Sequence, residues 1–117
     1  MKNKEIKKEV AKYCKKWINR LGLHGWHIDI HYDDSKPGIS ASTYPQWEYM
    51  LATITFYPNE INTVKNPYIE ALVIHELMHV MLSQMNETPT TGNVNKHEER
   101  VATIFENAFL INNGKKR

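Results

Sequence analysis

The chain has 117 residues, and its 15 Lys and Arg against 13 Asp and Glu give a formal net charge of +2 at pH 7. This charge is too small to indicate a nucleic-acid partner. The length supports one core and leaves no room for a second, so we expect a single domain over residues 1–117. Because no apolar run reaches membrane-spanning length, we expect a soluble globular protein without a membrane partner.

Cysteine content and the start of the chain bear on where the protein works. The lone Cys14 excludes an internal disulfide and offers no cysteine pair for a structural zinc site. The basic start, residues 1–5, is not followed by an apolar stretch of signal-peptide length. The expected location is therefore the cytoplasm.

Apolar residues recur at helical spacing from Ile6 to Leu21, and Gly22 ends this run, which predicts a first helix. Most lysines of this segment fall on the opposite face. Such a face could bind nucleic acid or a membrane, but it is more often simply solvated, and that is our interpretation.

Two strands are predicted by alternating apolar residues. In the first, apolar Trp26, Ile28 and Ile30 alternate with polar residues, namely His27, Asp29 and His31. We interpret the shared face of these polar residues as solvent-exposed and not as a metal site. Residues 51–57 form the second strand, which Pro58 ends. Residues 39–47 predict only an irregular strand, interrupted at Pro45. An exposed edge of the 51–57 strand could pair with an extended peptide by main-chain hydrogen bonds.

A second helix is predicted from Asn66 and Pro67, a capping residue followed by a proline at the first helical position, through to Met85. The segment is apolar almost all round, which predicts a buried helix. Its only strongly polar side chains are Glu70, His75, Glu76 and His79. Buried ionisable groups are costly unless they are paired or bind a metal.

The segment from His75 to His79 has the pattern His-Glu-x-x-His. Two histidines four residues apart share a helix face, so both imidazoles can reach one metal ion. Catalytic zinc lowers the pKa of a water in its open position, and the adjacent Glu76 can take the proton. The sequence therefore predicts a Zn²⁺ site with His75 and His79 as ligands and Glu76 as the general base.

Catalytic zinc usually takes three protein ligands, and the candidates for the third lie before an amphipathic helix predicted from the spacing of Val101, Phe105 and neighbouring apolar residues. Glu98 is in phase with Val101 and Phe105, on the predicted inward face, and this phase favours it. Glu99 is in phase with Ala102, Thr103 and Glu106, and Thr103 could form a hydrogen bond to a ligating histidine.

Competing explanations leave the third ligand open. Glu98 could form a capping box with Asn95, and Glu99 could be a solvated residue of the first turn. His97 is a further possible ligand. We expect either Glu98 or Glu99 to bind the metal.

These motifs resemble the gluzincin metallopeptidases, in particular the small single-domain minigluzincins and the short predicted zinc peptidases of prophages and mobile elements. Residues 23–30 and 50–56 are similar to their first strand and to the strand before their active-site helix. The resemblance implies that His75, His79 and Glu98 or Glu99 bind zinc and that Glu76 is catalytic. Family members often carry an acidic or amide residue four positions past the ligand glutamate, where this chain has Ala102 or Thr103.

The sequence thus predicts an α+β fold, with a small antiparallel or mixed sheet and three helices, and a zinc metallopeptidase acting on peptides or proteins. The candidates for stabilising the oxyanion are Tyr44, Tyr68 and His97. One alternative is a zinc-binding interaction or accessory protein of a mobile element without general proteolytic turnover. Another is a nucleic-acid-binding accessory protein, which we consider the weaker interpretation.

Overall fold

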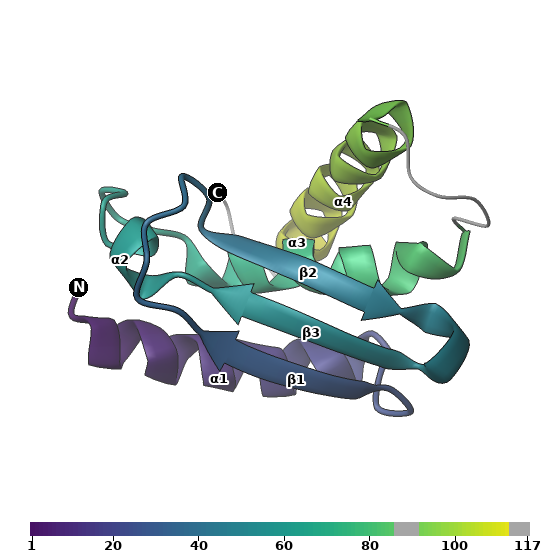
Figure 1. Ribbon diagram of the computed structural model, residues 1–117, viewed down its shortest axis with the longest axis horizontal. Helices are drawn as coiled ribbons and strands as arrows, with labels where there is room; N and C mark the ends of the chain where they lie inside the picture. The colour runs from purple at the N-terminus through teal and green to yellow at the C-terminus, as the bar shows by residue number, and fades with distance from the viewer. Residues whose placement is uncertain (86–91, 113–117) are drawn as a thin grey trace.

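The computed structural model describes residues 1–85 and 92–112. The fold is α+β, as predicted, with a mixed sheet of three strands and three main helices (Figure 1). In chain order the elements are α1 (Asn3–Arg20), β1 (His27–Tyr32), β2 (Ala41–Gln46), η1 (Trp47–Tyr49), β3 (Leu51–Phe56), α2 (Pro58–Ile61), α3 (Ile69–Leu82), η2 (Ser83–Met85) and α4 (Gly92–Asn112). No helix among the described residues is long and apolar enough to span a membrane.

The strand order is β1-β3-β2, with β3 parallel to β1 and antiparallel to β2. The chain passes from β1 to the far edge of the sheet, and β3 then enters between the two earlier strands. Both edges of β3 are therefore paired, and the prediction that this strand offers a free edge to a peptide is wrong. The sequence does not show this insertion, because strand order depends on which hydrogen bonds form between segments far apart.

Strand β2 is one of the two edge strands, and it runs through Pro45 without the predicted interruption. Pro45 pairs with Ala52 of β3. A proline fits in an edge strand where its missing N–H would face away from the sheet. Since backbone direction alternates along an antiparallel pair, the N–H groups of Ala41 and Thr43 also face the free edge.

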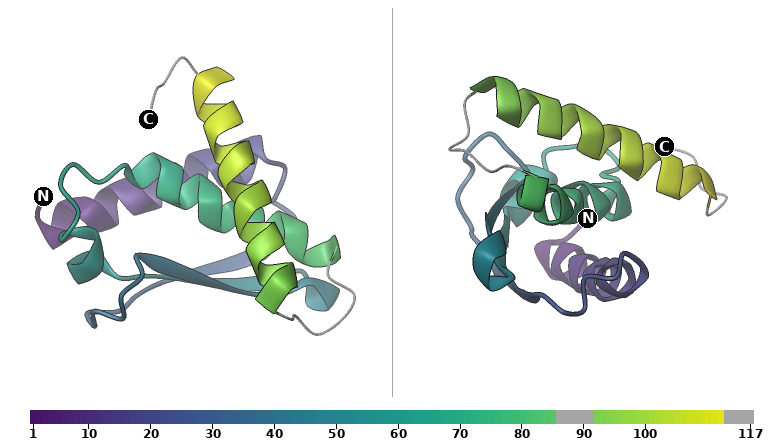
Figure 2. Two further views of the ribbon diagram at one scale, coloured as in Figure 1. Left: turned by 90° about the horizontal axis from the view of Figure 1, so that it is seen from above. Right: turned by 90° about the vertical axis from the view of Figure 1, so that its right-hand side faces the viewer.

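Helix α3 lies against the sheet with α1 on one side and α4 on the other (Figure 2). Val73, Ile74 and Leu77 are fully buried, which confirms the prediction of a buried helix. The helix begins at Ile69, and Asn66 instead adopts a left-handed backbone conformation with φ of 54°. The predicted capping role of Asn66 is therefore wrong; asparagine is used here in a turn, where it tolerates positive φ.

Glu70 connects α3 to α1. Its buried carboxylate accepts hydrogen bonds from Lys16 Nζ at 2.7 Å and from Trp17 Nε1 at 2.8 Å. These partners offset the cost of burying its charge. Glu70 therefore has a structural role, which separates it from the other polar residues of α3.

Helix α4 differs from its prediction in start and in orientation. It begins at Gly92, so Asn95 lies within the helix and the proposed capping box is wrong. Ala102, Glu106 and Leu110 are buried, whereas Phe105, predicted to face inward, is 42% exposed. The contact of Phe109 with Trp17, with ring centroids 5.8 Å apart, belongs to the buried face. Both the buried face and the exposed face of α4 carry apolar residues. Packing against α3 and α1 decides which of the two faces is buried.

Candidate metal centre

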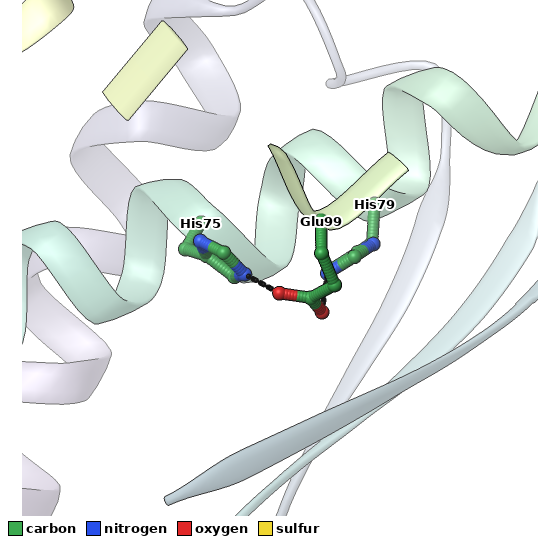
Figure 3. A group of neighbouring side chains, drawn as sticks. All are labelled: His75, His79 and Glu99. Carbon is green, nitrogen blue, oxygen red and sulfur yellow. Dashed lines mark hydrogen bonds and ion pairs between the residues drawn. The ribbon is translucent and has the colours of Figure 1, made fainter. Parts of the chain in front are cut away.

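The two histidines of α3 project from one face of the helix toward α4, with ring centroids 5.1 Å apart. Glu99 of α4 points between them (Figure 3). Its two carboxylate oxygens lie 2.7 Å from His75 Nε2 and 2.7 Å from His79 Nε2. A single carboxylate thus bridges both imidazoles and joins the two helices.

This group fits a metal ion. The ligand atoms of His75, His79 and Glu99 all lie within 4.8 Å of one another. Two imidazoles and a carboxylate are a ligand set of catalytic zinc, which binds nitrogen and oxygen at about 2.0–2.2 Å and keeps a fourth position open. The group borders a cleft of about 490 Å³, so an open position would be accessible to water and substrate.

The geometry favours Glu99 over the alternatives that the sequence left open. Glu99 shares a helix face with Ala102, Thr103 and Glu106, the face that packs against α3. The argument from helical phase in favour of Glu98 depended on an inward face that the structure does not have. The side chains of Glu98 and His97 lie outside the part of the chain that the structure describes.

Glu106 is a residue of this site to which the sequence gave no role. One of its carboxylate oxygens lies 2.9 Å from His75 Nδ1, and its side chain is almost fully buried. Such a contact fixes the orientation of a ligating imidazole and leaves Nε2 to face the metal. The sequence feature that could have indicated this role is its spacing, because Glu106 follows Glu99 by two helical turns and so shares its helix face.

Thr103 lies where the resemblance implies an acidic or amide residue. Its hydroxyl is 3.5 Å from His75 Nδ1 and donates a hydrogen bond to the backbone oxygen of Glu99 at 3.0 Å. Its predicted contact with a ligating histidine is therefore long. The shorter contact with His75 comes from Glu106, one turn further along α4.

The catalytic candidate Glu76 is 5% exposed, and its Oε1 accepts a hydrogen bond from Thr43 Oγ1 of β2 at 2.7 Å. Burial raises the pKa of this carboxyl, while the Thr43 hydrogen bond and the neighbouring histidines oppose the rise. A carboxyl with a raised pKa is better matched to accepting a proton near neutral pH.

The contact between His75 and Glu99 also shifts the pKa values of both groups. The Glu106 hydrogen bond raises the pKa of His75 to about 9, against the opposing effect of burial and with help from Glu99. Burial pushes the pKa of Glu99 upward, but electrostatic interactions and hydrogen bonds with His75 and His79 outweigh it and hold that pKa below its ordinary value. With a pKa of about 9, His75 is protonated at pH 7 when no metal is bound.

The structure describes the side chains of two of the three candidates for stabilising the oxyanion, and they lie in different places. Tyr68 lines the same cleft as His75. Tyr44 is 67% exposed and neighbours Thr43 in β2, so its side chain points to the opposite face of the sheet. The side chain of His97 is outside the described residues. Of the two tyrosines, only Tyr68 lies at the cleft.

No family model matches the chain, and neither the curated proteins nor the solved structures contain a significant match. The function must therefore be inferred from the site itself.

The choice of third ligand can be tested with neighbouring residues. Glu99→Gln should weaken zinc binding by more than the 10–100-fold typical of losing a partner of a ligand, because it removes a ligand charge. Glu98→Gln, the matched control, should leave the zinc affinity almost unchanged. Competition with a chromogenic chelator measures both constants. The reverse order of affinities would assign the ligand to Glu98.

The raised pKa of His75 predicts proton release on zinc binding. Zinc requires a neutral imidazole, and at pH 7 His75 carries its proton in the metal-free protein because its pKa is about 9. Binding should therefore release that proton, and the release should disappear as the pH rises through about 9. The dependence of calorimetric enthalpy on buffer ionisation measures it.

Glu106→Gln is the comparison variant for this measurement. It keeps a hydrogen-bonding group but removes the charge that raises the pKa of His75, so proton release near pH 7.5 should fall. Equal release from both proteins would show that Glu106 does not control this proton.

Proposed function

We propose that this protein is a zinc-dependent peptidase that hydrolyses peptide bonds. The observation that carries the proposal is the convergence of His75, His79 and Glu99 beside the buried carboxylate of Glu76, at the wall of an open cleft. A structural zinc site usually has four protein ligands and needs no separate carboxylate. Three ligands, an open side and an adjacent base together favour hydrolysis.

Zinc held by these ligands would supply a Lewis acid that acidifies a water and polarises the scissile carbonyl. Glu76 takes the proton of the attacking water and returns it to the leaving amine. Its Oε1 is held by Thr43, while Oε2 accepts no hydrogen bond from the described residues. One oxygen is thus fixed and the other is left for the proton.

Thr43 also links this chemistry to substrate binding. It lies in β2, and the backbone of Ala41 and Thr43 faces the free edge of that strand. An extended peptide paired with this edge would pass the side chain that holds Glu76. The peptide-binding edge proposed from the sequence is therefore reassigned from β3 to β2.

The cleft extends from the metal-binding group along α3 toward the start of β2 and the end of α2. The apolar part of its wall comprises Ile39, Ala41, Ile61, Val64, Pro67, Ile69 and Leu72. Its carboxylates are Glu76, Glu99 and Glu106, which already contact other residues, and no Lys or Arg of the described chain lines it. Such a wall suits an apolar substrate side chain and offers no cation for a terminal carboxylate.

Replacing the general base separates catalysis from metal binding. Glu76→Gln should lower kcat/KM by at least about 10²–10⁴, the usual contribution of acid–base catalysis, while zinc content stays stoichiometric. Glu48→Gln, an exposed residue of η1, serves as the control. Hydrolysis of quenched fluorescent peptides and metal analysis measure the two properties.

Full hydrolytic activity in Glu76→Gln would show that Glu76 is not the general base. Stoichiometric zinc in the unaltered protein, without cleavage of any library peptide, would instead support the zinc-binding accessory protein.

The apolar wall predicts the substrate side chain. Leu72→Ala should enlarge the cleft and shift the preference next to the scissile bond from medium to larger apolar residues, by about 10-fold in relative kcat/KM. Ile104→Ala, on the exposed face of α4, is the matched control and should not change the preference. Cleavage-site profiling of a peptide library measures both, and an unchanged profile for Leu72→Ala would place this side chain elsewhere.

A further inference from the structure

Charge is distributed unevenly along the chain. The first 20 residues contain eight of the 15 Lys and Arg residues but only two of the 13 carboxylates. This segment carries a formal charge of +6, and the remainder carries −4. Almost the whole of the segment is α1. The modest net charge of the protein therefore conceals a strongly basic helix.

Most cations of α1 point outward because its other face is fixed in the core. Ile6, Val10, Cys14 and Trp17 are all buried. On the outer side are four exposed residues that we call the lysine face: Lys4, Lys8, Lys12 and Lys15. At about 100° per residue they fall within an arc of about 80° and span about 16 Å of helix length.

Few contacts neutralise this face. Glu5 and Glu9, the two carboxylates of α1, fall on one flank of the arc and not within it. Among the described residues, the ammonium groups of the lysine face form no ion pair, and Lys12 lies 4.8 Å from the ring centroid of Tyr13. By contrast, Lys16 is bound to Glu70. Like charges on adjacent turns repel one another, so an anionic partner would stabilise this surface.

We propose that the lysine face binds the phosphate backbone of double-stranded nucleic acid without sequence selectivity. Lysine provides a compact positive charge on a flexible stem, which suits phosphate contacts and carries no base readout. This proposal departs from the sequence-based interpretation of the face as merely solvated, because an ordinary solvated helix surface mixes charges of both signs. The concentration of one sign on a single exposed arc is what a regular polyanion complements.

The same observations disfavour two other partners. A helix that binds a membrane surface must insert its apolar face, and that face of α1 is occupied by the protein core. A protein partner usually needs an apolar or aromatic anchor near the centre of the contact, and the lysine face has none. Charge complementarity over an extended surface remains, and nucleic acid provides it.

Bound nucleic acid would leave the cleft accessible. Helices α1 and α4 lie on opposite sides of α3 (Figure 2), and the cleft is lined by residues of α4, α3, β2 and the 61–68 segment, with none from α1. The inference does not depend on peptidase activity, because none of the lysine-face residues contributes to the metal-binding group.

The test measures anisotropy of a fluorescent DNA duplex of about 20 base pairs as the salt concentration is varied. Four phosphate contacts predict a slope of log K against log salt of about −3.6. Lys8→Gln/Lys15→Gln should reduce the magnitude of this slope by about 1.8. Lys36→Gln/Lys65→Gln removes the same charge from exposed positions outside α1 and should leave the slope nearly unchanged.

Any one of three outcomes would overturn the proposal. These are absence of duplex binding at about 50 mM salt, equal effects of the two double variants, or binding to phosphatidylserine vesicles without binding to the duplex. Equal effects would show that only net charge matters, and vesicle binding alone would identify a membrane surface. Circular dichroism of all variants verifies that they are folded.

Discussion

The bridge that Glu99 forms between His75 and His79 is the contact on which the site depends. It joins α4 to α3 by placing one carboxylate, 58% exposed, between two largely buried imidazoles. Without an acidic partner or a metal, two nearby imidazoles would have to stay neutral, since burial penalises their charged form. The bridge therefore adds a polar contact to the apolar packing of α3 and α4.

Two different elements, α4 and β2, provide the contacts that support the residues around this bridge. Glu106 of α4 orients His75 through its second ring nitrogen, and Thr43 of β2 holds one oxygen of Glu76. Each contact comes from an element on a different side of α3. A displacement of either α4 or β2 would thus misplace a ligand or the base. These supporting contacts therefore have a functional consequence beyond stability.

The fold also explains how one helix accommodates four strongly polar side chains. Glu70 is directed toward Lys16 and Trp17 of α1, whereas His75, Glu76 and His79 are directed toward the cleft and α4. Opposite faces of α3 therefore serve structure and chemistry. The cations of α1 that are not needed for this packing stay on the outside of the molecule, away from the cleft.

The sequence by itself determined the local features. Helical periodicity set α1, alternation set β1 and β3, and the spacing of His75 and His79 placed both on one face, because these patterns depend only on backbone geometry. Tertiary structure decided which strand has a free edge, which stripe of α4 faces inward, and hence that Glu99 and Glu106 meet His75. Those outcomes depend on contacts between segments far apart in the chain, such as Phe109 with Trp17, and a one-residue difference in helical phase is too small for local periodicity to resolve when both stripes contain apolar residues.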